Sequence, residues 1–229
     1  MNDPATVRCD TGSMTATLPT PVELVGSAVR LTPMSASDFP DLYRALARRE
    51  VFAGGYGGGI AALPADLDGF REFAASYYLD GDAPSLAWTI RSSTMHGEAR
   101  VVGATWMGDF ELEHESAHLG ATAYCPEAWG TIVNPETKLL ALGLAFDSGF
   151  NRVRIQADSA NARSRSAIER LGAEFEGVLR RDQKRADGSW RDTAVYSILA
   201  DEWPAVKARL EERIATMAHG ATGADQRRR

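Results

Sequence analysis

The chain has 229 residues, of which 44% are hydrophobic and 24% are charged, a composition typical of one ordinary globular domain. Its formal charge of −6, from 25 basic and 31 acidic residues, argues against a broad basic surface for nucleic acid and suits a cationic partner better. The longest apolar run, Leu139 to Phe146, spans eight residues, far short of the about 20 needed to cross a bilayer.

The N-terminal residues and the cysteines exclude further classes. Residues 1–20 lack the apolar core of a secretory signal, so we expect a disordered tail there and a cytoplasmic protein. Met14 would serve as a start as well as Met1. The two cysteines, Cys9 and Cys125, support neither a disulfide framework nor a zinc site, and we expect two free thiols.

Hydrophobic periodicity predicts the elements in chain order. The last two strands are joined by Asp187-Gly188, a tight-turn signal. We expect one domain over residues 21–218, followed by a second disordered tail at 219–229. Strands are predicted at 22–31, 86–91, 101–110, 117–124, 152–158, 174–183 and 191–199, and helices near 39–46, after Asp66, at 135–148, at 162–171 and around 206–217.

The segment from Trp129 to Gly177 carries the clearest functional pattern. A turn after Trp129 opens a predicted helix, one strand follows, and a second helix begins at Asn161. The first N–H groups of a helix have no intrahelical partner and bind phosphate or thioester oxygens. Two such clusters separated by one short strand are the layout expected for a coenzyme A site.

The order of elements, with this turn after the fourth strand, resembles the GNAT acyl-CoA N-acyltransferase superfamily. The resemblance covers about residues 22–204 and implies an α/β (α+β) GNAT fold, with a mixed, mostly antiparallel seven-stranded sheet flanked by helices and an added C-terminal helix. Several motifs are similar to the RimJ/RimL-type branch, which includes ribosomal-protein N-terminal acetyltransferases: Trp129-Gly130, Asn161-Ala162-Arg163-Ser164, Ile168 to Ala173, Glu176-Gly177 and Asp187 to Asp192.

The resemblance implies acetyl-CoA or another acyl-CoA as co-substrate. Ile132 stands where the family's phosphate loop usually has a second glycine, which requires a wider loop path or a shifted diphosphate. We expect Asn134 to cap the following helix, and Glu127 and Glu136 to oppose an anionic ligand. The residues implied to bind the co-substrate are Trp129, Gly130, Thr131, Ile132, Val133, Asn134, Asn161, Arg163 and Arg165.

Some of these residues have a simpler interpretation. Asn161 is also an ordinary helix N-cap, and Arg163 and Arg165 are also typical solvated arginines. By resemblance, Ser164 lies near the thioester sulfur, where its hydroxyl would protonate the leaving thiolate. Cys125 suits a structural thiol better than a nucleophile.

The general base is less defined. Asp182 is the leading candidate, because an acidic residue occurs near this position in the ribosomal-protein branch, although this residue type at this position is more typical of an exposed strand residue. Asp192 is second, although beside Arg191 it also suits an ion pair that fixes the hairpin. An α-amine with a pKa of about 8 is easier to deprotonate than a lysine at about 10.4, so an α-amine acceptor makes a smaller demand on the base.

Two other patterns bear on the acceptor. Asp109, Glu111, Glu113 and Glu115 alternate, which on a strand places them on one face, either as the wet edge of a hairpin or along the amine entrance. His114 and His118 would stand about 13 Å apart on such a strand, so we assign no metal. The run Gly54 to Gly59 lacks the P-loop signature and indicates a wall of the acceptor site or a flexible connection.

The sequence therefore predicts an acyl-CoA-dependent N-acyltransferase, with acetyl as the first donor, that acts by direct attack of a primary amine. The acceptor would be a protein N-terminus or a small cationic amine. One alternative is a succinyl-CoA-type donor whose carboxylate pairs with the arginines, and another is a non-catalytic acyl-CoA-binding or sensing protein. We expect no nucleic-acid or membrane partner, and the oligomeric state, a homo-oligomer included, stays open.

Overall fold

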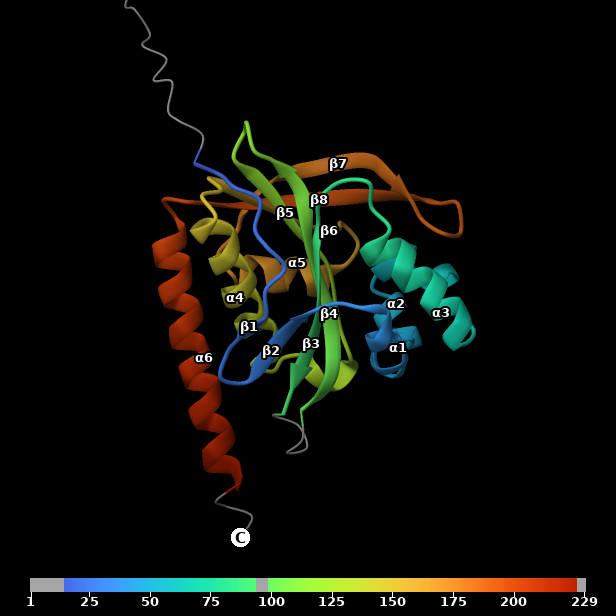
Figure 1. Ribbon diagram of the computed structural model, residues 1–229, viewed down its shortest axis with the longest axis horizontal. Coiled ribbons are helices and arrows are strands. Elements are labelled where there is room, and N and C mark those ends of the chain that lie inside the picture. Colours follow the sequence, from blue (N-terminus) through green and yellow to red (C-terminus); the bar gives the residue numbers. More distant parts are fainter. Residues whose placement is uncertain (1–14, 94–98, 226–229) are drawn as a thin grey trace, which may run out of the picture.

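A computed structural model describes residues 15–93 and 99–225, with side chains up to His219. Its centre is one eight-stranded sheet in the order β1-β2-β3-β4-β5-β6-β8-β7 (Figure 1). Neighbours β5 and β6 run parallel, and the other neighbouring pairs are antiparallel. The strands are β1 (Leu24–Val25), β2 (Val29–Pro33), β3 (Leu86–Ser92), β4 (Arg100–Glu111), β5 (Ser116–Tyr124), β6 (Arg152–Asp158), β7 (Glu174–Lys184) and β8 (Trp190–Leu199).

The prediction of seven strands was wrong by one. The single strand expected from Val22 to Leu31 folds back on itself, because the chain turns after Val25 and Gly26 N donates to Val29 O at 2.9 Å. Leu24 then pairs with Leu31. The other six expected strands agree with β3 to β8 to within one residue at each end.

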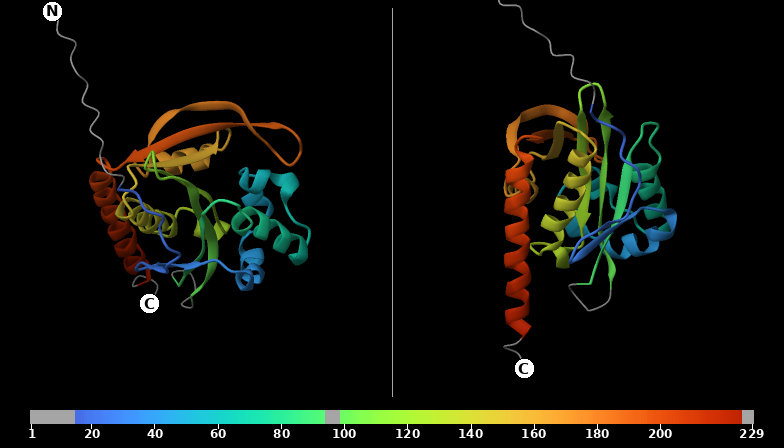
Figure 2. Two further views of the ribbon diagram at one scale, coloured as in Figure 1. Left: turned by 45° about the horizontal axis from the view of Figure 1, so that its top comes forward. Right: turned by 60° about the vertical axis from the view of Figure 1, so that its left-hand side comes forward.

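Helices cover both faces of this sheet (Figures 1 and 2). Asp66 caps α3 by accepting a hydrogen bond from Gly69 N at 2.9 Å, and a π-helical turn (Ala75–Leu79) continues that helix. On one side lie α1 (Phe39–Leu46), α2 (Arg49–Phe52) and α3 (Leu67–Ala74); on the other lie α4 (Val133–Asp147) and α6 (Trp203–Asp225), while α5 (Ala162–Glu169) packs on β6.

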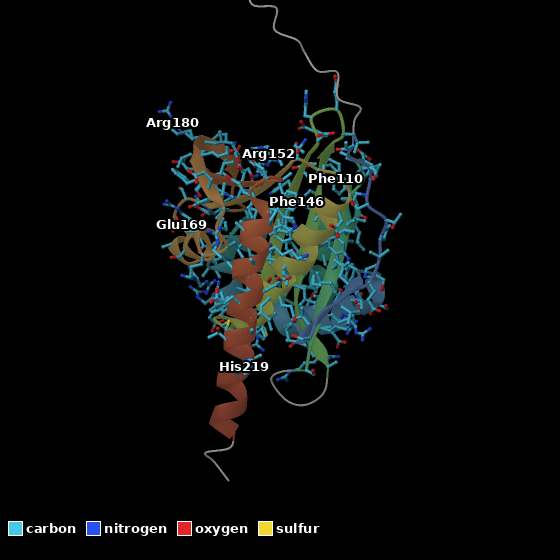
Figure 3. The ribbon with its side chains drawn as sticks, turned by 90° about the vertical axis from the view of Figure 1, so that its left-hand side faces the viewer. Phe110, Phe146, Arg152, Glu169, Arg180 and His219 are labelled. Atoms are coloured by element: carbon cyan, nitrogen blue, oxygen red, sulfur yellow. The ribbon has the colours of Figure 1, made fainter. Side chains whose placement is uncertain are left out.

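Helix α6 runs alongside α4 and extends beyond the helix expected from the sequence. Phe146 of α4 stacks on Trp203 of α6 with ring centroids 5.1 Å apart, and Figure 3 shows Phe146 beside the red helix. Between the helices and the sheet lies one apolar core, in which Trp88, Phe52 and Leu119 are fully buried. No helix in the described residues is long and apolar enough to cross a membrane.

Part of the expected N-terminal tail lies on the fold. Ala16 is buried, and Thr17 N donates to Ser148 O at 2.9 Å. The other residues of that tail up to position 14, with Cys9 and Met14, lie outside the described residues, as do residues 226–229. Within residues 15–93 and 99–225 no cluster of side chains suited to a metal ion occurs.

Candidate active site

Strands β5 and β6 pair only where they begin. Their register joins Ser116 to Arg152 and His118 to Arg154, although β5 continues to Tyr124 and β6 to Asp158. The two strands therefore diverge, and a cavity of about 490 Å³ is lined by their separated parts. Its other walls come from the turn before α4, from α5 and from the glycine-rich segment after α2.

β5 is bulged where it lines this cavity. Ala104 pairs with Ala123 and Trp106 with Gly120, so Thr105 faces two residues of β5. Ala121 adopts a φ of 45°, and Tyr78 donates its hydroxyl to the Ala121 carbonyl at 2.8 Å. A non-glycine residue in this region costs of order 1–3 kcal/mol, and bulges of this kind redirect a strand next to a functional site.

The hairpin of β7 and β8 reaches towards the helices α1 to α3 (Figure 2), and Gln183 and Arg191 of this hairpin line the cavity. Its tip contacts the glycine-rich segment, because Ala186 N donates to Gly58 O at 3.0 Å. Arg185, at the base of that tip, donates from Nη2 to the buried Asp158 at 2.6 Å. The end of β6 is thereby fixed to the hairpin, and Gly54 and Gly55 form a wall of the cavity.

The turn before α4 offers free N–H groups to the cavity. Gly130 has a φ of 72°, a conformation that favours glycine, and no atom lies within 4 Å of the position a Cβ would take. Within the described part of the chain, the N–H groups of Gly130 and Asn134, two residues that line the cavity, donate to no protein acceptor. Such groups bind anions at the start of a helix.

Three expectations about this turn were wrong. α4 begins at Val133 with Ile132 as its N-cap, so Asn134 is already inside the helix. Glu127 forms an ion pair with Arg48 at 2.6 Å, and Glu136 is buried against the β1–β2 turn, so neither faces an anion in the cavity. Both carboxylates are instead paired with groups distant in the sequence.

The second turn matches the N-cap prediction. Asn161 Oδ1 accepts from Ser164 N at 3.0 Å, and Asn161 Nδ2 donates to the Gly54 carbonyl. The Arg163 guanidinium lies 3.6 Å from the centroid of the Trp129 ring, a cation–π contact that joins the two helix starts. Trp129 is itself held by Nε1, which donates to Tyr124 O at 3.0 Å.

Seven of the residues predicted from the sequence meet at the cavity: Trp129, Gly130, Thr131, Asn134, Asn161, Arg163 and Ser164. Ile132 and Val133 do not line it, because the Val133 side chain is buried in the core and Ile132 only caps the helix. Arg165 also points elsewhere, since its Nε donates to the Tyr196 hydroxyl at 3.0 Å.

The structure does not bring Asp182 to the cavity. Asp182 is exposed on β7, and its neighbour Gln183 lines the cavity instead, as expected when successive strand residues point to opposite faces. Asp192 accepts a hydrogen bond from Arg181 N at 2.7 Å, which fixes the irregular part of the β7–β8 hairpin.

The acidic run does not form one face of a strand. β4 ends at Glu111 and β5 begins at Ser116, with a turn between them. Asp109 and Glu115 have φ values of 48° and 49°, so the alternation is interrupted at both ends of the run. Of the four acidic residues, Asp109 alone lines the cavity.

Two buried polar side chains at the cavity were missed by sequence reasoning. His118 Nδ1 lies 3.0 Å from Asp109 Oδ2, and burial lowers the pKa of His118 below its usual 6.5. Lys138 Nζ donates to Thr122 Oγ1 at 2.7 Å, and burial lowers the pKa of Lys138 to about 7. The available signal for Lys138 was a cation directly before the apolar run of α4.

Several arginines that line the cavity have no carboxylate partner. Within the described residues Arg163, Arg170, Arg191 and Arg213 take part in no ion pair. The nearby acid Asp158 is neutralised by Arg185 at 2.6 Å. Free cations and free N–H groups around one cavity suit a polyanionic ligand.

A parallel strand pair that splits over a cavity, between two helix starts, is the arrangement expected of an acyl-CoA-dependent acyltransferase of the fold that the sequence resembles. The family model described as Acetyltransferase (GNAT) domain matches residues 28–174. The chain belongs to this GNAT acetyltransferase family, and it is an acyltransferase enzyme.

Solved structures agree with this assignment. An acetyltransferase from T. thermophilus is 34% identical, with a TM-score of 0.73 over 85% of this chain and 97% of the other. A GCN5-related N-acetyltransferase from Brucella melitensis, at 24% identity, has a TM-score of 0.77 over 89% and 90%. Mycobacterium smegmatis RimJ, at 21% identity, shares the fold with a TM-score of 0.61 over 84% and 95%. No curated protein matches the chain.

Proposed function

We propose that the protein transfers an acyl group, with acetyl as the first donor, from acyl-CoA to a primary amine by direct attack. The separation of β5 from β6 carries the proposal, because it opens a cavity lined by two helix starts and by unpaired arginines. Mycobacterium smegmatis RimJ was solved with CoA-disulfide, and the acetyltransferase MccE, of similar fold, with acetyl-CoA and AMP.

The coenzyme A diphosphate would lie against the N–H groups of Gly130 and Asn134, with Arg163 beside it. The pantetheine arm would then run between β5 and β6 towards the bulge at Gly120 and Ala121. Backbone N–H groups of β5 there would polarise the thioester carbonyl. Ser164, at the cavity wall, would give a proton to the leaving thiolate.

The protonation state of the Cys125 thiol favours direct attack by the amine over a covalent acyl-enzyme. Burial raises the pKa of this thiol, and Glu127 nearby raises it further. The thiolate that a covalent acyl-enzyme would require is therefore disfavoured. The acceptor would be a peptide N-terminus or a small cationic amine, which the half-exposed carboxylate of Asp109 would attract to the cavity.

A second candidate donor is a dicarboxylic acyl-CoA such as succinyl-CoA, and Lys138 favours it. Lys138 is 5% exposed, and its ammonium has one protein acceptor, Thr122. A lysine ammonium has three donors, so a donor carboxylate would satisfy those that Thr122 leaves free. The arginines expected for this role fit less well, because Arg163 stacks on Trp129 and Arg165 points away.

The test separates binding from turnover. Acetyl-CoA, succinyl-CoA and free CoA at millimolar concentration should raise the melting temperature, and peptides or polyamines should then release CoA thiol from the donors. Arg163→Ala should weaken the donor-induced shift, whereas the matched variant Arg165→Ala should leave it unchanged. No shift with any donor would overturn the proposed site, and a shift without amine-dependent thiol release would indicate binding alone.

A further inference from the structure

We infer that His118 is the general base that accepts the proton of the attacking amine, and that Asp109 is the positioning residue that orients its imidazole. The inference rests on the proposed function, since it assigns a role within that reaction. It replaces Asp182, which lies outside the cavity. Both His118 and Asp109 line the cavity, on the adjacent strands β5 and β4.

The hydrogen bonds around Asp109 fix the tautomer of His118. The Asp109 Oδ2 atom lies 3.0 Å from His118 Nδ1 and accepts from Arg154 Nη2 at 2.7 Å. Contacts with His118 and Arg154 lower the pKa of Asp109, so it is a carboxylate at neutral pH. A carboxylate only accepts hydrogen bonds, so Nδ1 carries the proton and Nε2 of a neutral ring carries the lone pair.

The free nitrogen is unusual for a buried histidine. Its Nε2 atom is buried and has no hydrogen-bond partner among the described residues, although the side chain is 9% exposed. Most buried polar side-chain atoms have a partner, so an unpaired acceptor beside a cavity indicates a group that arrives with a ligand. An amine N–H is a donor of the required kind.

Gly120 places this nitrogen beside the bulge. A Cβ at Gly120 would lie 2.7 Å from His118 Nε2 and 2.9 Å from Cε1, closer than real contacts allow. The ring therefore occupies the space over Gly120, next to Ala121, where the thioester carbonyl is proposed to lie. Trp106 holds the ring from the side, edge to face, with centroids 5.7 Å apart.

The protonation state of His118 suits a base. The charged groups that face it are Asp109 from β4, Arg154 from β6 and Lys138 from α4. Burial and the two cations lower the pKa of His118, and Asp109 opposes them without reversing the shift. The imidazole is therefore neutral at pH 7. Lys138 has a pKa of about 7, but its Nζ donates a hydrogen bond to Thr122.

The reaction balances with these groups. The amine nitrogen attacks the thioester carbon and forms the C–N bond, and its proton passes to His118 Nε2. The tetrahedral intermediate collapses, the C–S bond breaks, and the thiolate takes a proton from Ser164 or from water. The imidazolium then returns its proton to solvent, and Ser164, where it served as the acid, regains a proton from solvent. The products are the amide and free CoA, and the enzyme is unchanged.

The first test compares His118→Gln with the control His114→Gln, which changes an exposed histidine in the turn between β4 and β5. Single-turnover acetylation of a peptide α-amine should slow by about 10²- to 10⁴-fold in the first variant and not in the second. The acetyl-CoA-induced shift in melting temperature should persist in both. Protonation of the α-amine, whose pKa is about 8, should lower the rate of both proteins as the pH falls. Below pH 6.5 the parent should show an additional loss of rate from protonation of His118, and this additional loss should disappear in His118→Gln.

Chemical rescue gives a readout that a structural role would not move. Imidazole should restore part of the rate of His118→Gly. A hydrazide acceptor has a low pKa and is already unprotonated, so its acylation rate should fall less on this substitution than the rate with the α-amine. Asp109→Asn should slow the α-amine reaction and shift the pH at which the additional loss of rate begins, and the half-exposed position of this side chain keeps the cost to folding small. A folded His118→Gln or Asp109→Asn with the parent rate and pH profile overturns the inference. Failure of the proposed function would differ, because the parent protein would then release no CoA with any amine.

Discussion

The Glu136 carboxylate holds the Ser27 turn through two hydrogen bonds, from the Ser27 N–H at 2.7 Å and from its hydroxyl at 2.6 Å. The second carboxylate oxygen accepts from the N–H groups of Ala28 and Val29 at 2.7 and 2.8 Å. The buried acid thus joins the first turn of α4 to the turn between β1 and β2. A Cβ on Gly26 would lie 2.6 Å from its Cδ, so that turn needs glycine there.

Glu136→Gln should therefore destabilise the fold. The amide places an NH₂ group against N–H donors, and a lost hydrogen bond to a buried charged group costs about 1.5–3 kcal/mol. Urea unfolding at pH 7 would measure the change. Ser27→Ala, which removes only the hydroxyl bond, should cost about 1 kcal/mol. Equal stability of parent and Glu136→Gln would contradict this role.

Lys138 should make the stability depend on pH. The pKa of Lys138 is about 7 in the folded protein against a usual 10.5, so the unfolded chain binds more protons between these values. The free energy of unfolding should then rise from pH 7 to pH 10.5, by an amount on the order of a few kcal/mol. In Lys138→Met this rise should be smaller and the stability at pH 7 higher. Parallel pH curves for the two proteins would argue against a lowered pKa.

The same substitution tests the second donor. Lys138→Met should lower kcat/KM for succinyl-CoA more than for acetyl-CoA, because only the succinyl group carries a carboxylate for the ammonium. The ratio of the two values, measured with one peptide acceptor, isolates this effect from any change in folding. A constant ratio means that Lys138 does not recognise the acyl group.

Substitutions of Asn161 and of Ser164 should have different effects. Asn161→Ala removes an N-cap, which costs about 1 kcal/mol, and it releases the Gly54 carbonyl, so stability and donor binding should both fall. Ser164→Ala should leave donor binding intact and lower kcat by about 10²-fold or less, because a thiol is a good leaving group. If Ser164→Ala has the single-turnover rate of the parent, Ser164 does not act as the general acid.

The acidic residues beyond Asp109 should not recruit the acceptor. Glu111 and Glu113 are exposed and do not line the cavity, so converting both to Gln should leave the acceptor KM and its salt dependence as in the parent. The measurement is the KM of one cationic peptide at about 0.1 M salt, where the Debye length is about 10 Å, and at about 1 M salt, where it is about 3 Å. A higher KM with a flatter salt response would show that the turn steers substrate.

Local rules along the chain were enough for much of this protein. Periodicity predicted β3 to β8 to within one residue at each end, and the Asn161 cap followed from a side chain that bonds an N–H three residues on. The tight turn that splits the first strand was missed, because it depends on Glu136, more than 100 residues away. Family resemblance supplied the coenzyme A site, most of whose expected residues meet at one cavity.

The position of the proposed acid–base groups was decided by tertiary structure. Strand alternation would place Asp109 with Glu111 and Glu113, but its φ of 48° and the pairing of β4 with β5 turn its carboxylate to His118. The sequence likewise could not show that Lys138 would be buried, or that Arg165 would bond Tyr196. Propensity and capping act over a few residues, whereas burial, bulges and ion pairs depend on which distant strands and helices pack together.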